Sequence, residues 1–197
     1  MNKIIRKIQY SEKVYRFDVE APLIAKSRKA GNFVIIRVDA NSERMPLTIA
    51  DADIEKGTIT LVVQKVGLSS TKLCNLNEGD EIHDVVGPLG NPTHIENFGT
   101  VLCAGGGVGV APMLPIIKAL KAAGNRVLSV IAGRSKDLVI MEDEVRASSD
   151  ELIIMTDDGS YGEKGVVTVG MEKLIQQEHI DKAFAIGPPI MMKFCCL

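Results

Sequence analysis

Hydrophobic and polar residues alternate in short runs along the first hundred residues, which is the pattern of half-buried β-strands. Turn residues such as Gly31 and Gly57 separate these runs. The pattern predicts strands over residues 3–10, 14–20, 33–39, 46–50, 58–66 and 81–86, with a short helix over 69–76. Six short strands separated by turns indicate a small antiparallel β-barrel.

The second hundred residues alternate strand signals with amphipathic helical signals. The predicted strands cover residues 101–104, 126–132, 151–156 and 182–186, and the predicted helices cover 112–123, 141–147 and 169–177. This order predicts a parallel sheet with ligands outside the carboxyl ends of its strands. The expected fold is therefore α/β with two domains, an antiparallel six-stranded β-barrel over 1–97 and a Rossmann-like parallel α/β sheet over 98–197.

Four glycines lie within residues 105–109, between the first of these parallel strands and a helix with Pro112 in its first turn. Glycine permits positive φ and close approach of a ligand to the backbone, and the free N–H groups of a helix start attract anions. The segment therefore predicts a phosphate site. The alternative is a turn that only packs tightly, and the spacing does not match G-x-G-x-x-G.

All four parallel strands are followed by glycine or small polar residues, at 105–107, 133–135, 156–159 and 187–189. These residues meet at one edge of the sheet, so together they favour a bound nucleotide. Asp157 and Asp158 could form a carboxylate pair for acid–base chemistry, but their Thr-Asp-Asp-Gly-Ser setting favours a turn with polar contacts to a ligand.

A second possible anion site lies in the first half, where a strand runs into Gly67 and a hydroxyl-rich helix start. Simple N-capping by Ser69 or Ser70 is the alternative. Two anion-receptive helix starts, one in each half, suggest one diphosphate in each. Arg44 and Thr48, near the start of another strand, can pair with phosphate and exchange hydrogen bonds, although both residue types are also ordinary on a surface.

Charge and composition narrow the function further. A net charge of -2 argues against a nucleic-acid-binding surface. No apolar run reaches the roughly 20 residues of a membrane span, and the first residues lack a signal-type core, so a cytoplasmic protein is expected. Cys74 and Cys103 are expected to be buried thiols, the Cys195-Cys196 pair lacks zinc-site spacing, and no metal site is predicted.

With these motifs in place, nearly the whole chain resembles the ferredoxin–NADP⁺ reductase superfamily. The resemblance is carried by Gly-Gly-Gly-x-Gly-x-Ala-Pro at 105–112, Gly133-Arg134, Arg-x-Pro-Leu-Thr at 44–48, Thr-Asp-Asp-Gly-Ser-Tyr-Gly at 156–162 and Gly187-Pro188-x-x-Met191. Two groups look most similar: the electron transfer subunit of dihydroorotate dehydrogenase and, more closely, the small subunit of NADH-dependent reduced ferredoxin:NADP⁺ oxidoreductase, also called sulfide dehydrogenase.

The resemblance implies FAD and either NAD(H) or NADP(H) as cofactors, with Thr48 as the catalytic residue near the reactive edge of the flavin. The implied flavin-binding residues are Arg44, Pro46, Leu47, Thr48, Val63, Gln64, Lys65, Gly67, Ser69, Ser70 and Thr71. The implied nicotinamide-nucleotide-binding residues are Gly105, Gly106, Gly107, Val108, Gly109, Gly133, Arg134, Thr156, Asp157, Gly187, Pro188 and Met191. Arg134 and Ser135 would lie near the adenosine ribose.

Three positions depart from the family pattern. Leu47 replaces an aromatic residue, with Arg44 one residue further upstream than usual, and Ile186 replaces a common cysteine. The relatives continue into a cysteine-rich segment that binds a [2Fe–2S] cluster, whereas this sequence ends at Leu197. An incomplete nucleotide-binding domain without the cluster is therefore expected.

The function implied is an FAD-dependent NAD(P)H oxidoreductase. It would move a hydride between NAD(P)H and FAD and single electrons to or from an iron–sulfur centre. Its expected partners are a larger flavin and iron–sulfur catalytic subunit and ferredoxin. The alternatives are an electron transfer subunit of dihydroorotate dehydrogenase and, in another class, a module that binds dinucleotides without turnover.

Overall fold

The computed structural model describes residues 2–196, and the chain divides into two compact units, Met1–Thr93 and His94–Leu197. The sequence pattern predicts the boundary slightly later, after residue 97. The buried Asn125 accounts for the difference, because it ties the intervening segment to the second unit. Its Oδ1 accepts the N–H of Phe98 at 2.7 Å, and its Nδ2 donates to the carbonyl of Glu96 at 2.8 Å.

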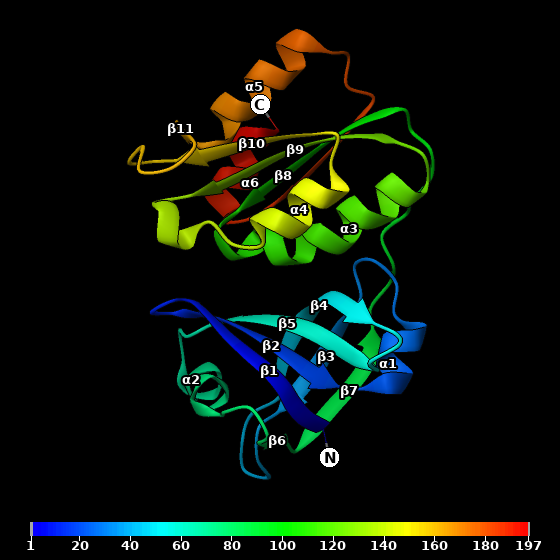
Figure 1. Cartoon of the computed structure of the whole chain (residues 1–197), viewed down its shortest axis with the longest axis vertical. Coiled ribbons are helices and arrows are strands. Elements are labelled where there is room, and N and C mark those ends of the chain that lie inside the picture. The colour runs from blue at the N-terminus through cyan, green and yellow to red at the C-terminus, as the bar shows by residue number, and fades with distance from the viewer. Residues whose placement is uncertain (1, 197) are drawn as a thin grey trace. The chain divides into compact units, whose positions relative to one another are not determined.

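The first unit is an antiparallel sheet with two short helices (Figure 1). Its elements are β1 (Asn2–Ser11), β2 (Val14–Glu20), α1 (Pro22–Ser27), β3 (Phe33–Arg37), β4 (Met45–Asp53), β5 (Thr58–Gln64), α2 (Leu68–Asn75), β6 (Glu81–Ile82) and β7 (Asp84–Leu89). The strand order is β6-β1-β2-β5-β4-β3-β7. Fully buried Phe17, Ile59 and Leu61 lie in its core.

The sheet of the first unit curls into a near-barrel. β6 and β7 lie at opposite ends of the strand order, yet only His83 separates them along the chain. The ends of the sheet must therefore approach each other. The prediction of one continuous strand over 81–86 is wrong, because His83 interrupts it and separates β6 from β7. The N–H of His83 donates to the carbonyl of Val38 at 3.3 Å. The sheet thus has seven strands among the described residues instead of six.

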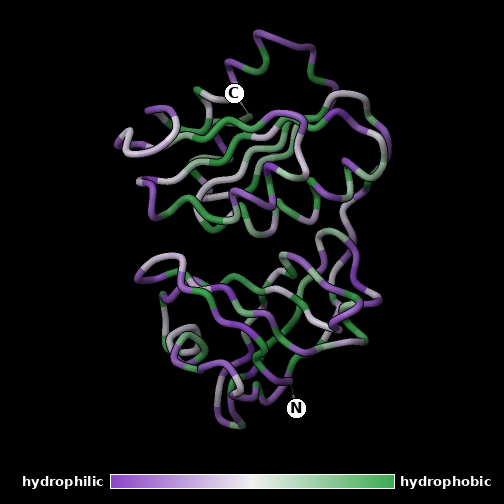
Figure 2. The backbone as a smooth tube through the Cα atoms, viewed as in Figure 1, coloured by the Kyte–Doolittle hydropathy of each residue, from purple (hydrophilic) through white to green (hydrophobic). Residues whose placement is uncertain are grey.

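The second unit is a parallel sheet with helices on both faces. Its elements are β8 (Thr100–Gly106), the 3₁₀ turn η1 (Gly107–Gly109), α3 (Val110–Ala122), β9 (Arg126–Gly133), the 3₁₀ turn η2 (Lys136–Leu138), α4 (Glu142–Ser148), β10 (Glu151–Thr156), β11 (Glu163–Lys164), α5 (Val167–Gln177), β12 (Lys182–Ile186) and α6 (Pro189–Cys195). Helices α3 and α4 cover one face, and α5 and α6 cover the other (Figure 1). The apolar runs of β8 and β9 form the hydrophobic centre of this sheet (Figure 2).

The strand order β11-β10-β9-β8-β12 confirms the predicted α/β architecture. From β8 the chain winds outward through β9 and β10 on one side, and β12 then joins on the other side. The order therefore reverses between β8 and β12, and ligands bind parallel sheets at such reversals.

Elements α1 and β11 were not predicted. α1 is only six residues long, too short to show a helical period, and the two-residue β11 pairs with β10 alone. Among residues 2–196, no helix combines the length and the apolar character needed to cross a membrane.

Candidate functional site

The start of α2 presents open backbone amides in the first unit. Gly67 is extended, and no atom lies within 4 Å of where a Cβ on it would be. The first helical bond runs from the N–H of Thr71 to the carbonyl of Gly67 at 2.9 Å. The three N–H groups before it, at residues 68–70, have no acceptor within the helix, so they can bind an anion.

Ser70 shapes this helix start from within. Its hydroxyl oxygen accepts the N–H groups of Val66 at 3.0 Å and Gly67 at 2.9 Å, and the hydroxyl donates to the carbonyl of Gly67 at 3.1 Å. Because these bonds occupy the hydroxyl, Ser70 holds the loop in place. The hydroxyls of half-buried Ser69 and Thr71 stay available to a ligand.

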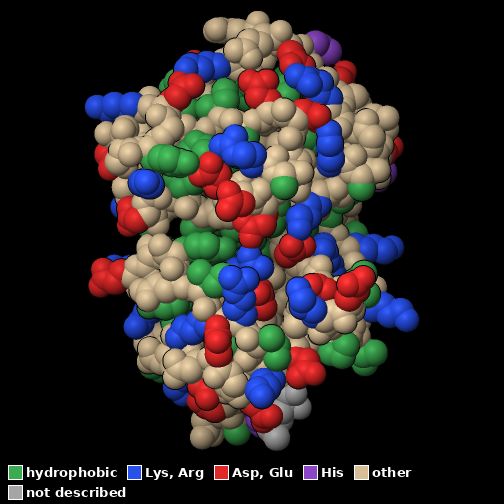
Figure 3. All heavy atoms as spheres, viewed as in Figure 1, with side chains coloured by type: hydrophobic (Ala, Val, Ile, Leu, Met, Phe, Trp, Pro, Cys, Tyr) green, Lys and Arg blue, Asp and Glu red, His purple; other side chains and the backbone are tan. Residues whose placement is uncertain are grey.

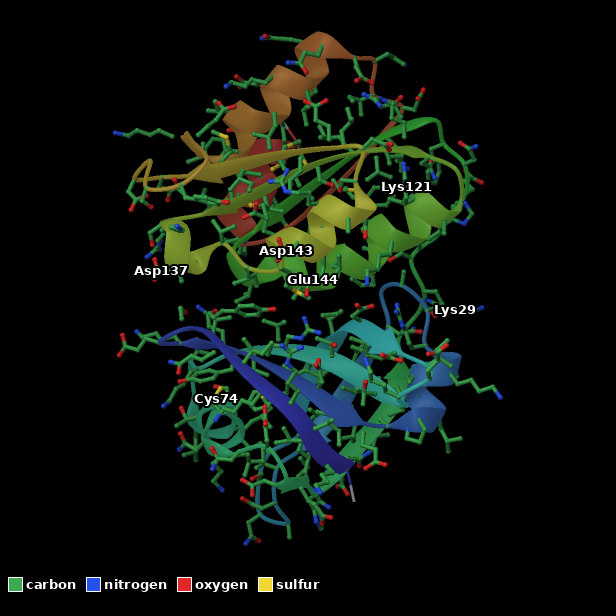
Figure 4. The ribbon with its side chains drawn as sticks, in the orientation of Figure 1. Lys29, Cys74, Lys121, Asp137, Asp143 and Glu144 are labelled. Carbon is green, nitrogen blue, oxygen red and sulfur yellow. The ribbon has the colours of Figure 1, made fainter. Side chains whose placement is uncertain are left out.

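Lys7 of β1 anchors the other end of α2, a contact that no sequence pattern predicted. Its Nζ donates to the carbonyls of Cys74 at 2.7 Å and Leu76 at 2.6 Å and lies 5.3 Å from the ring centre of Tyr15. A cation at the carboxyl end of a helix is favourable. Lys7 therefore fixes the axis of α2 and, with it, the direction of the open amides; Figure 4 labels Cys74 on this helix.

β4 carries the predicted ring-binding residues. Its register pairs Thr48 with Phe33 and Leu47 with Val34. The half-buried Thr48 hydroxyl has no hydrogen-bond partner among residues 2–196, so it is free to bond a ligand. Arg44 precedes β4 and is exposed.

The predicted ligand-binding residues at the end of β5 differ in how deeply their side chains are buried. The Val63 side chain is 1% exposed and belongs to the core, so only its backbone could reach a ligand. Gln64 is exposed and Lys65 is half-buried. The side chains able to meet a ligand here are therefore those of Gln64 and Lys65.

The four glycines at 105–109 have different roles. Gly105 and Gly106 continue β8, which corrects the expectation that the strand ends at residue 104. A Cβ on Gly106 would collide with the sulfur of Met191, and a Cβ on Gly109 would collide with the carbonyl of Ile186. These glycines thus permit close packing, as the alternative interpretation proposed.

Gly107 alone among them is open. Its φ is +54°, and no atom lies within 4 Å of its Cβ position. It begins the 3₁₀ turn that leads into α3, where N–H groups precede the first helical bonds. The amides at residues 107–109 and the dipole of α3 can therefore receive a phosphate.

At the reversal between β8 and β12, Met191 of α6 packs against Gly106 at the end of β8 and against Gly187, which directly follows β12. A Cβ on Gly106 or on Gly187 would overlap the thioether of Met191, and Pro188 is exposed next to Gly187. The half-buried Met191 thus covers the glycine backbone where the resemblance places the nicotinamide nucleotide.

The loops after β9 and β10, residues 133–138 and 156–161, form one unit that we call the rim. The N–H of Asp157 donates to the carbonyl of Gly133 at 3.1 Å, and the N–H of Asp158 donates to the carbonyl of Arg134 at 3.2 Å. The buried Thr156 hydroxyl bonds the backbone of Tyr161 and therefore supports the turn.

The adjacent aspartates Asp157 and Asp158 of the rim have different surroundings. The hydroxyl and N–H of Ser160 hold the pKa of Asp158 below its ordinary value. Asp158 is therefore a turn-stabilising carboxylate and a poor proton donor, as the turn interpretation expects. Asp157 is exposed, and its side chain has no partner among the described residues.

The remaining candidate groups do not join these sites. Cys74 and Cys103 are buried as expected, and burial raises the pKa of Cys103 to about 12, so its thiol is unreactive. Residues 2–196 contain no group of three or more His, Cys, Asp or Glu able to hold a metal ion. On the face drawn in Figure 3, positive and negative side chains are interspersed.

No protein-family model matches the chain. Among curated proteins, it is 49% identical over 197 residues to the dihydroorotate dehydrogenase B (NAD⁺) electron transfer subunit homolog of Thermotoga maritima, covering 100% of this chain and 70% of that protein. It is 32% identical over 197 residues to the dihydroorotate dehydrogenase B (NAD⁺) electron transfer subunit of Streptococcus pneumoniae, covering 98% of this chain and 75% of that protein.

Solved structures agree with these relatives. A chain from the structure of NADH-dependent reduced ferredoxin–NADP oxidoreductase superposes with a TM-score of 0.94 at 46% identity, covering 99% of this chain and 70% of that one. Phthalate dioxygenase reductase, at 19% identity and a TM-score of 0.73, shares the fold. The chain therefore belongs to the family of dihydroorotate dehydrogenase electron transfer subunits, within the ferredoxin–NADP⁺ reductase superfamily.

Proposed function

We propose that this chain transfers a hydride between NAD(P)H and FAD and exchanges single electrons with an iron–sulfur centre. The observation that carries the proposal is the start of α2, where the buried Ser70 holds a loop with three open amides. The family supplies the cofactor class, because it is a family of flavin and nicotinamide electron-transfer modules. Bound flavin accepts a hydride and releases electrons singly.

The residues of the first unit fit FAD. The amides at residues 68–70 would bind its diphosphate, supported by the hydroxyls of Ser69 and Thr71. Gln64 and Lys65, at the end of β5, are available to its side chain. The unpartnered Thr48 hydroxyl on β4 would hydrogen-bond the reactive edge of the flavin ring, which makes Thr48 the proposed catalytic residue.

The residues of the second unit fit a nicotinamide nucleotide. The amides at 107–109 would hold its pyrophosphate, and the backbone of Gly187 and Pro188 would adjoin the nicotinamide. The rim would receive the adenosine ribose through Arg134, Ser135 and Asp157. The protein orients the reactants in this account, so no side chain has to act as acid or base.

The partner is proposed from the relatives. Their names describe electron transfer subunits, so we propose a larger flavin and iron–sulfur catalytic subunit as the partner of this chain, with ferredoxin as electron carrier. A dihydroorotate dehydrogenase is the second candidate, favoured by the names of the 49% and 32% identical relatives. The 46% identical structure favours the ferredoxin-linked enzyme.

Anaerobic reduction tests the proposal. The protein is reconstituted with FAD and titrated with NADH and NADPH, while the visible flavin absorbance is followed. Loss of the flavin band, with recovery on adding an iron–sulfur acceptor, supports turnover. Binding of nucleotide without loss of the band would instead support a dinucleotide-binding module without catalysis.

A further inference from the structure

Lys72 of α2 contacts the loop between β3 and β4, residues 38–44. Its Nζ donates to Oδ2 of Asp39 at 3.1 Å and to the hydroxyl of Ser42 at 3.4 Å. Lys72, Asp39 and Ser42 are all half-buried, so this contact is partly sheltered from water. The two bonds therefore hold the β3–β4 loop against α2.

The β3–β4 loop is folded around the same carboxylate. The N–H of Asn41 donates to Oδ1 of Asp39 at 2.9 Å, and the N–H of Ser42 donates to the Asp39 carbonyl at 3.1 Å. The hydrogen bond from Lys72, followed by those from Ser42 and Asn41, lowers the pKa of Asp39 to about 2. The ionised carboxylate thus bonds its own loop with one oxygen and α2 with the other.

Arg44 lies at the end of this loop. Only one residue separates it from Ser42, and two residues of extended chain span about 7 Å. Arg44 is exposed, and its guanidinium has no hydrogen bond or ion pair among residues 2–196. The loop therefore carries an uncommitted guanidinium, a group that pairs bidentately with phosphate.

On α2, the contact with the loop lies close to the open amides. Lys72 is three positions after Ser69, so the two residues are neighbours on the helix surface. Ser69 belongs to the segment 68–70, whose N–H groups lack acceptors within the helix. The ion pair of Lys72 is therefore close in sequence to both groups that could bind an anion, the Arg44 guanidinium and these amides.

We propose that Lys72 and Asp39 are positioning residues for the FAD diphosphate, because their contact holds Arg44 where it can bind the same diphosphate as the amides of α2. The ammonium of Lys72 is already bonded to Asp39 and Ser42, so Lys72 acts through Arg44 and not on FAD. A loop that is ordered before binding loses less conformational freedom when the ligand arrives. The proposal rests on the proposed function, which places the diphosphate at the start of α2.

FAD titration of the apoprotein, followed by flavin fluorescence, tests the proposal. We expect R44A to weaken FAD binding at least tenfold, and K72M or D39A to weaken it about fivefold. R44A/K72M should bind FAD no more weakly than R44A alone, because a positioning residue has no effect once its target is removed. K72R should recover most of the loss, since its guanidinium can still donate to Asp39.

K56M is the matched control. Lys56 also pairs with an aspartate, Oδ2 of Asp53 at 2.8 Å, but it lies in the turn between β4 and β5, outside the β3–β4 loop and α2. It should leave FAD affinity unchanged.

Three outcomes would overturn the proposal. One is an unchanged FAD affinity in R44A or K72M, and another is a pair of losses that multiply in R44A/K72M. The third is a loss in K72M without one in D39A, which would mean that Lys72 binds the diphosphate directly. Native apoprotein that fails to bind FAD contradicts the proposed function itself, so the two failures are distinguishable.

Discussion

Ser70 and Gly67 close the loop before α2 on itself: the Gly67 N–H donates to the Ser70 hydroxyl at 2.9 Å, and this hydroxyl donates to the Gly67 carbonyl at 3.1 Å. Ser70 is 5% exposed, so water cannot easily replace these bonds. The geometry of the proposed diphosphate site therefore depends on a side chain that need not touch the diphosphate.

Replacing Ser70 by alanine is expected to lower stability and FAD affinity together. The change leaves the N–H groups of Val66 and Gly67 without their acceptor, which costs about 1–3 kcal/mol for buried groups. Urea unfolding and FAD titration measure the two effects. S69A is the control: it should weaken FAD binding while apoprotein stability changes little, and equal destabilisation by both variants would contradict this account.

Removing the charge of Lys7 should loosen α2. K7M deprives the carbonyls of Cys74 and Leu76 of a charged donor, for which we expect a loss of about 1.5–3 kcal/mol in the free energy of unfolding. Hydrogen exchange should show that K7M accelerates amide exchange in α2, relative to the native protein, more than it does in β8. K3M is the comparison, because no hydrogen bond or ion pair involves the Lys3 side chain among the described residues. Unchanged exchange in K7M would rule out the anchoring role.

The packing of Gly106 predicts a rescue. G106A places a methyl group against the Met191 sulfur and should destabilise the protein by about 1–3 kcal/mol through overpacking. M191A in the same chain should recover part of this loss. G107A should cost about 1–2 kcal/mol through its positive φ, with no rescue by M191A, because its Cβ position is open. Thermal unfolding of the wild type, G106A, G106A/M191A, G107A and G107A/M191A decides between these outcomes.

Asp39 predicts a pH dependence. Its hydrogen bonds to Lys72, Ser42 and the N–H of Asn41 lower its pKa from 3.8 to about 2. The folded state binds the proton of Asp39 less tightly than the unfolded state does. The ionised Asp39 carboxylate therefore stabilises the folded protein above pH 3.8, and this contribution is lost as the pH falls through about 2. The difference in urea midpoint between the native protein and D39N should shrink over this range. The group is exposed, so the effect should be small, and a difference that grows on acidification would refute it.

The sequence predicted elements whose signal is local. The alternation in β2 and β5 and the apolar runs of β8 and β9 mark strands because each strand buries one or both faces. The strand break at His83 was missed because alternation continues through it, and only the closure of the sheet requires it there. The two-residue β11 has too few residues to show any period.

The parts of the candidate site that sequence reasoning missed are long-range contacts. Lys7 of β1 hydrogen-bonds the carboxyl end of α2, and no pattern in the sequence around Lys7 predicts this contact. Gly106 packs against Met191, which lies in a helix far along the chain. The sequence alone could not distinguish this glycine, which permits close packing, from one that binds a phosphate. Ser70 was expected among the flavin contacts, and its bonds within the loop depend on the exact fold of that turn.

Thr48 predicts a kinetic effect without loss of cofactor. T48V removes the hydroxyl while keeping the branched shape on β4, so FAD binding should persist. Loss of one hydrogen bond, worth ~1 kcal/mol, should slow flavin reduction by about fivefold. Stopped-flow absorbance gives the rate, and FAD stoichiometry is the control. An unchanged rate with full FAD occupancy would remove Thr48 from the catalytic role.

Hydride transfer to a bound flavin is the central claim, and a rapid-mixing experiment with isotopically labelled coenzyme tests it most directly. FAD-loaded protein is mixed anaerobically with NADH or with NADH deuterated at both C4 positions of the nicotinamide. The account predicts loss of the flavin band in a single enzyme-bound step that is slower with the deuterated coenzyme. A flavin band that persists with saturating NADH, or protein that fails to retain FAD at all, would contradict it.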